Sequence, residues 1–179
     1  MTNYAVFLRG VNVGGINIKM AGLRTALAAL PLRNVATLLA SGNVVCGADM
    51  GPAELKALVE DCLRLNFGYD AWVVLLDQAR LSAIIDACPY PPDSAERHSY
   101  VTLSSDPAVL DELEGLGREF DDAGVLRLDP AALAWLAAVG GTIDSPFSKL
   151  TAKTKYKAAT TTRNLRTLMK VRDALLRPN

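Results

Sequence analysis

The stretch Leu8–Gly15, Leu-Arg-Gly-Val-Asn-Val-Gly-Gly, carries the residues of this chain best suited to hold an anion. It follows the apolar run Ala5–Leu8, which predicts a strand, and it precedes a helical pattern that begins near Lys19. Backbone N–H groups at such a strand-to-helix turn can bind an anion, and Arg9 and Asn12 add side-chain donors. The ligand-binding residues expected in this loop are Arg9, Asn12, Gly14 and Gly15.

The loop departs from the common phosphate-binding motifs. A dinucleotide fingerprint requires Gly-x-Gly-x-x-Gly, which is absent. The spacing from Gly10 to Gly15 matches the start of a P-loop, but Ile16 and Asn17 stand where that motif needs Lys and Ser or Thr. A magnesium-nucleotide P-loop is therefore not indicated. The alternative is that the glycines only supply the positive φ of a tight connection.

Composition places the chain among ordinary globular proteins. It has 179 residues, of which 50% are hydrophobic and 21% charged, with a formal net charge of zero. A zero net charge argues against a non-specific DNA coat protein. No apolar run approaches the ~18 residues of a membrane span, and no signal-peptide pattern is visible. We therefore expect a cytoplasmic protein with no membrane partner.

Cysteine and histidine usage offers no metal or nucleophile motif. Cys46, Cys62 and Cys88 are odd in number and contain no Cys-x-x-Cys pair, so we predict reduced thiols, no metal and no cofactor. His98 is the only histidine, and a Gly-x-Ser-x-Gly elbow is absent. No catalytic residue is assigned.

Hydrophobic periodicity predicts a βαββαβ order over residues 1–77, which is the ferredoxin-like unit with an antiparallel sheet and helices on one side. Helices are expected from Met20 and from Pro52. The expected strands are Tyr4–Arg9, Val35–Leu39, a strand beginning at Val44–Cys46, and Ala71–Leu76.

Residues 78–179 form a second expected half with a βαββ order, followed by two closing helices. The two halves could also make one compact unit. The expected elements are a helix over Gln78–Ala87, a linker over Cys88–Ser94, a strand over Ser99–Leu103, a helix from Pro107 through Leu116, a hairpin of Val125–Leu128 and Leu133–Leu136, and helices near Ser145–Lys153 and Thr162–Leu176. The fold class is therefore α+β, with antiparallel sheets and C-terminal helices.

Charge is distributed unevenly in this second half. Residues 106–129 contain eight acidic side chains and only Arg118 and Arg127 as basic ones, whereas residues 145–172 contain eight basic side chains and no acidic one. The basic segment could be a solvated face or a partner of the acidic segment. It could equally be a surface for an anion or a nucleic acid.

The expected start of the last helix adds further candidates. Thr160–Thr162 offer N-cap hydroxyls, and Arg163 in a first turn would oppose the helix dipole. A bound anion would explain such an arginine. The site residues expected in this half are Lys149, Thr162, Arg163 and Asn164.

Four segments together resemble the bacterial domain of unknown function 1697 family. They are Phe7–Gly15, Ser41–Val45, Ser148–Leu150 and Ala159–Asn164. The resemblance implies two ferredoxin-like α/β halves and brings no established activity. Members often have an aromatic residue after the Arg-Asn pair, where this chain has Leu165, and Gln before Ser-Gly-Asn, where it has Ala40.

These candidates suggest one cleft. In a ferredoxin-like sheet the end of the first strand lies near the turn between strands two and three, so Arg9 should approach Ser41 and Asn43. With the C-terminal candidates folded back, the cleft would suit a phosphorylated or nucleotide-like ligand. It contains no obvious general base. The alternatives are a nucleic-acid or protein interaction module and an enzyme acting on a phosphorylated ligand.

Overall fold

The computed structural model describes residues 1–11, 17–68 and 70–177. The chain divides into two compact units, one formed by Met1–Leu81 with Lys170–Asn179 and the other by Ser82–Met169. The division into 1–77 and 78–179 stays a prediction.

The first unit has the predicted βαββαβ order. Its sheet has the strand order β2-β3-β1-β4, and every neighbouring pair is antiparallel. This arrangement confirms a ferredoxin-like half. The elements are β1 (Thr2–Arg9), α1 (Met20–Ala28), β2 (Arg33–Leu38), β3 (Asn43–Ala48), α2 (Pro52–Phe67) and β4 (Trp72–Asp77).

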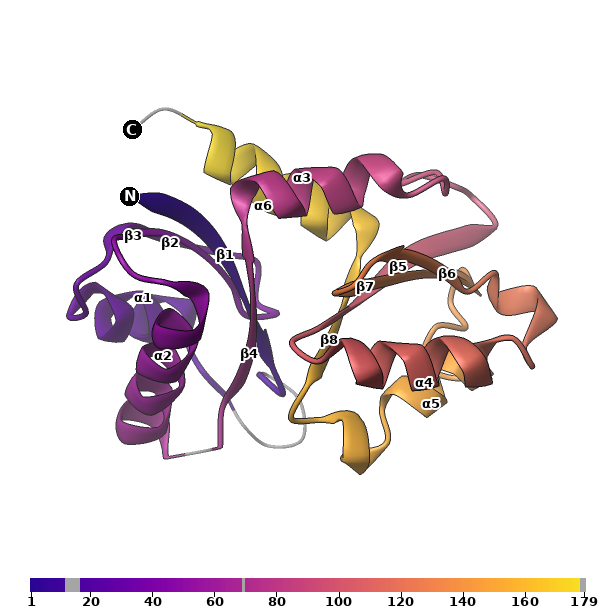
Figure 1. The fold of residues 1–179 in the computed structure, drawn as a ribbon, viewed down its shortest axis with the longest axis horizontal. Helices are drawn as coiled ribbons and strands as arrows, with labels where there is room; N and C mark the ends of the chain where they lie inside the picture. The colour runs from indigo at the N-terminus through magenta and orange to yellow at the C-terminus, as the bar shows by residue number, and fades with distance from the viewer. Residues whose placement is uncertain (12–16, 69, 178–179) are drawn as a thin grey trace. The chain divides into compact units, whose positions relative to one another are not determined.

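Both helices pack on one face of the first sheet (Figure 1). Alternate residues of β1 point to opposite faces, and Tyr4, Val6 and Leu8 face the helices. Pro52 at the first helical position starts α2, and Gly68 ends it with φ of 64°. The apolar faces of the two helices thus pack on the face of the sheet that carries Tyr4, Val6 and Leu8.

The C-terminal half of the last helix, α6 (Leu165–Leu176), belongs to the first unit from Lys170 onward. Ala174 and Leu175 line a cavity of about 350 Å³ together with residues of β2 and β3. Between the two sheets in sequence lies α3 (Gln78–Ala87).

The second unit repeats the same topology with the strand order β6-β7-β5-β8, again antiparallel throughout. Two ferredoxin-like halves are thereby confirmed. The helices α4 and α5 cover one face of this sheet (Figure 1). The remaining elements are β5 (Arg97–Ser104), α4 (Pro107–Gly117), η1 (Asp121–Ala123), β6 (Leu126–Asp129), β7 (Ala132–Ala138), α5 (Pro146–Thr151), η2 (Thr154–Tyr156) and β8 (Thr160–Asn164).

Strand β8 corrects the sequence prediction of a helix from Thr162. The helix begins only at Leu165, and the residues before it pair with β5 from Thr160↔Ser104 to Asn164↔Tyr100. Three consecutive threonines favour a strand because their β-branched side chains restrict χ1. The free edge of β5 supplies the backbone partners that such a strand needs.

The core of the second unit is built around Trp135. Its ring stacks on Tyr100 at a centroid distance of 4.8 Å and meets Phe147 edge-on at 5.4 Å. The indole N–H donates to Thr102 Oγ1 at 3.0 Å, and that oxygen shares a 2.8 Å hydrogen bond with Thr162 Oγ1. The polar atoms of this core therefore satisfy one another.

Over the described residues, no helix combines the length and the apolar character needed to cross a membrane.

Candidate functional site

Arg9 is the last residue of β1 and points to the sheet face opposite α1 and α2. Phe7 pairs with Asn43 of β3, so these two side chains share a face. Arg9 lies two residues beyond Phe7 and therefore shares that face too. Arg9 and Asn43 thus come to the same end of the first sheet.

The turn Ser41–Asn43 is held rigidly against this end of β1. Leu8 N donates to Gly42 O at 2.8 Å. Asn43 is fully buried, and its Nδ2 donates to Leu38 O at 2.9 Å and to Ser41 Oγ at 3.0 Å. The hydrogen bonds between Ser41, Asn43 and Leu38 therefore stabilise the turn next to Arg9.

The guanidinium of Arg9 is half-buried. Desolvation lowers the pKa of Arg9 below its ordinary value, although an arginine still keeps its charge at neutral pH. A cation withdrawn from water in this way interacts more strongly with an anion than a fully solvated one does.

Arg163 lies within β8, opposite Val101 of β5, and is 8% exposed. The expectation that it sits in the first turn of a helix, against the helix dipole, is therefore wrong. Its Nη1 donates to Thr161 Oγ1 at 2.7 Å and to Thr162 O at 2.9 Å. A buried guanidinium needs such acceptors because an unpaired one would be costly to desolvate.

Thr162 and Asn164 do not share the face of Arg163. Thr162 pairs with Thr102 on the face that carries Trp135, which the helices cover. Asn164 Oδ1 accepts from Arg166 N at 2.9 Å and so caps α6. The capping role expected for the threonines belongs to Asn164.

Lys149 is a surface residue of α5. Its side chain is 64% exposed, and Nζ lies 3.7 Å from Asp144 Oδ1. Further along the basic segment, Lys155 bonds to Glu112 of α4, and Tyr156 Oη donates to the same carboxylate at 3.0 Å. These donors hold the pKa of Glu112 below its usual value. Part of the basic segment therefore does pair with the acidic one.

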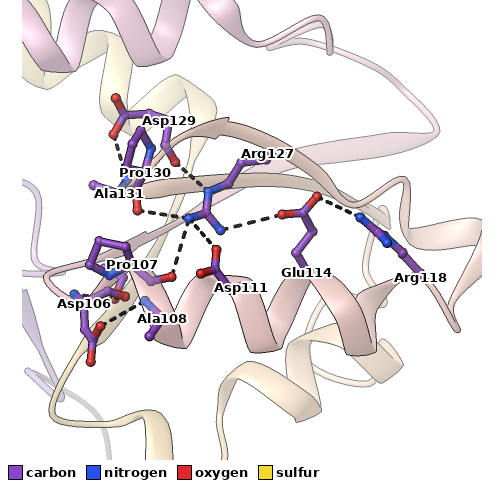
Figure 2. A network of polar contacts seen from close by, with 11 residues as sticks. Asp106, Pro107, Ala108, Asp111, Glu114, Arg118, Arg127, Asp129, Pro130 and Ala131 are labelled. Atoms are coloured by element: carbon purple, nitrogen blue, oxygen red, sulfur yellow. Dashed lines mark hydrogen bonds and ion pairs between the residues drawn. The ribbon is translucent and has the colours of Figure 1, made fainter.

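The acidic segment also encloses Arg127, a residue that we did not single out from the sequence (Figure 2). Arg127 Nη2 lies 3.1 Å from Asp111 Oδ1, and Nη1 lies 3.7 Å from Glu114 Oε2. Nε donates to Asp129 O at 2.9 Å. These contacts join α4 to the β6–β7 turn, so Arg127 is a structural clamp. The sequence feature that could have indicated this role is the position of Arg127 within the acidic segment 106–129.

The remaining loop candidates, Asn12, Gly14 and Gly15, lie outside the described residues. The other candidates fall into the two units: Arg9, Ser41 and Asn43 in the first, and Lys149, Thr162, Arg163 and Asn164 in the second. A single cleft holding both sets stays a prediction.

The cysteines are free thiols. Burial raises the pKa of Cys46 to about 11 and also raises the pKa values of Cys62 and Cys88. Groups of three or more potential metal ligands are absent from the described part of the chain. His98 lies on β5 with Nδ1 3.5 Å from Tyr100 Oη.

The chain is similar to a family of proteins of unknown function and to a solved bacterial structure. The sequence profile of a family described as "Protein of unknown function (DUF1697)" matches residues 1–131. Among solved structures, the conserved bacterial protein SP0830 from Streptococcus pneumoniae is similar, with a TM-score of 0.79 and 23% identity over 97% of this chain and 98% of that chain. At that identity the likeness concerns the fold. A search of curated proteins finds no match.

Proposed function

Because the chain belongs to the DUF1697 family of proteins of unknown function, we propose a function from its own residues: it binds a small anionic ligand, phosphorylated or nucleotide-like. Arg9 is the principal cation of the proposed site. Asn12, Gly14 and Gly15 contribute donors from the glycine-rich loop that follows β1 in sequence.

The observation that supports this proposal is the half-buried guanidinium of Arg9 beside a braced turn. Burial lowers the pKa of Arg9, and a partly desolvated guanidinium attracts an anion more strongly than a fully solvated one does. Ser41 and Asn43 hold the neighbouring turn through the hydrogen bonds of Asn43 Nδ2. A donor on a rigid strand end loses little conformational entropy when a ligand binds.

In the second unit, taken by itself, the proposed anion-binding cations are Arg163 and Lys149. Arg163 is only 8% exposed, and a cation in such a setting attracts an anion more strongly than a solvated one does. Its contribution is tested by its own variant, Arg163→Lys, which keeps the charge and removes the planar donor geometry.

The experiment is a thermal-shift screen of inorganic phosphate, pyrophosphate, AMP and ATP, followed by calorimetry of each hit. A ligand at about 100 times its Kd adds ~2.7 kcal/mol to stability. Arg9→Gln should weaken binding by roughly tenfold to a hundredfold, since a charge-assisted hydrogen bond contributes ~1.5–3 kcal/mol. Turnover of a hit in the same samples would identify an enzyme.

The matched control is Arg33→Gln, because Arg33 lies on β2 of the same sheet with a 70% exposed side chain. It should bind the hit as the unaltered protein does. The proposal fails if no anion stabilises the protein, or if Arg9→Gln and Arg33→Gln bind the hit equally well. We further propose a cytoplasmic location, which cell fractionation tests.

A second candidate is a nucleic-acid surface on the basic segment of the second unit. Lys149, Lys153, Lys155 and Lys157 are all exposed there. Such a surface predicts that affinity for mixed oligonucleotides falls steeply with salt, and that the slope lessens by about one for each phosphate-binding lysine that is replaced. Lys153→Gln with Lys157→Gln tests this slope, because the ion pairs of Glu112 and Asp144 are made by Lys155 and Lys149.

A further inference from the structure

The second unit contains a pocket of about 600 Å³ at the open edge of β7. This volume lies within the range of small-molecule sites, ~300–1,000 Å³. Its lining combines apolar side chains with charges of both signs. The residues that define it are Arg97, Phe120, Asp121, Asp122, Leu136 and Phe147.

The pocket exists because β6 is shorter than β7. The paired residues of β6 and β7 stop at Leu126↔Ala134, whereas β7 continues to Ala138. On the side away from β5, with which they pair, Leu136, Ala137 and Ala138 therefore border the pocket. The short helix η1 supplies the opposite wall through Asp121 and Asp122.

The apolar wall of the pocket is fixed in place. Phe147 is fully buried, and its ring meets Trp135 edge-on at 5.4 Å. A Cβ on Gly117 would lie 2.8 Å from the Phe147 ring, so only glycine leaves room for this ring position. Phe120 and Leu136 complete a surface suited to an apolar group of a ligand.

The charged groups of the pocket are Arg97, Asp121 and Asp122, and a hydrogen bond holds Arg97 in place. Arg97 Nη2 donates to Asp122 O at 2.6 Å, which orients the guanidinium and leaves its other N–H groups for a further acceptor. Asp121 and Asp122 have exposed side chains. Among the described residues, no cation lies within ion-pair distance of either carboxylate. A cation and two carboxylates thus line the same apolar pocket.

We propose that this pocket binds a zwitterionic ligand of the amino-acid type with an apolar side chain. The ligand carboxylate bonds to Arg97, the ammonium group to Asp121 or Asp122, and the side chain packs against Phe120 and Leu136, the partly exposed apolar residues of the lining. A ligand with only one of these charges leaves the opposite charge of the pocket without a partner. This site lies in the second unit and does not depend on the anion site proposed at Arg9.

The first test is calorimetry of the unaltered protein with three probes of matched shape. L-Phenylalanine carries both charges, phenethylamine lacks the carboxylate, and 3-phenylpropanoate lacks the ammonium group. We expect L-phenylalanine to bind at least tenfold more tightly than either of the others. Equal binding of the three probes, or no binding of L-phenylalanine and L-leucine at millimolar concentration, overturns the proposal.

The second test uses variants to assign each charge. Arg97→Gln should weaken L-phenylalanine at least tenfold and leave phenethylamine unchanged, whereas the double variant Asp121→Asn with Asp122→Asn should weaken L-phenylalanine and leave 3-phenylpropanoate unchanged. Glu119→Gln, an exposed neighbour outside the pocket, should change none of these affinities. A variant that weakens all three probes alike, with an unchanged melting temperature, contradicts the assigned contacts. Arg9→Gln should leave L-phenylalanine binding intact even if the anion site is refuted.

Discussion

Gly42, in the turn beside Arg9, allows a direct test of how the candidate site is built. Its φ of 75° lies in the left-handed region, and a Cβ there would lie 2.9 Å from Leu8 Cβ and 3.4 Å from Val11 Cβ. Leu8 is a core residue with 1% exposure. Gly42→Ala therefore imposes both a strained backbone and an overpacked contact.

The two costs can be separated by a matched variant. A left-handed alanine costs ~1–2 kcal/mol, and the stiffer unfolded chain returns ~0.4–1 kcal/mol. Gly140→Ala carries only these effects, since Gly140 has φ of 79° and no atom of the described residues lies within 4 Å of its Cβ position. Overpacking adds ~1–3 kcal/mol at Gly42 alone.

We expect the melting temperature of Gly42→Ala to lie below that of Gly140→Ala by about 2–12 °C, at ~2–4 °C per kcal/mol for a chain of this size. Differential scanning calorimetry measures both. Equal melting temperatures for the two variants would refute the reasoning, because they would show that the turn does not press on Leu8.

The remaining predictions concern the second unit. Thr162→Val removes the hydrogen bond to Thr102 Oγ1 and should lower the free energy of unfolding, measured by urea titration, by ~1 kcal/mol. The control is Thr154→Val, at an exposed position. Equal stability of the two variants would contradict the role of Thr162 in the core. The pKa of Glu112 is lowered in the folded protein, so its ion pair adds stability above the unfolded pKa, and that stability disappears as pH falls through the folded pKa. Glu112→Gln should flatten this acid-side decline, and a Glu112 carboxyl titrating in NMR at the midpoint of an isolated glutamate would argue against the pairing with Lys155.

Much of the fold follows from local sequence patterns. The βαββαβ order predicted for the first unit is confirmed. It could be predicted because alternating and helical apolar spacings are properties of short segments, each of which buries one face. That topology also places the end of β1 beside the β2–β3 turn, as predicted for Arg9 and Asn43.

Long-range contacts decided what the sequence patterns left open. Strand β8 forms because β5, about 60 residues earlier in the chain, supplies its hydrogen-bond partners, as in the Thr102–Thr162 pair. The local sequence around β8 does not show that β5 lies beside it. The same holds for Lys155, which bonds to Glu112 across 43 residues of sequence. The pocket at β7 likewise depends on where β6 stops pairing. Local periodicity specifies which elements form, whereas hydrogen-bond partners, ion pairs and cavities depend on distances that only the packed chain defines.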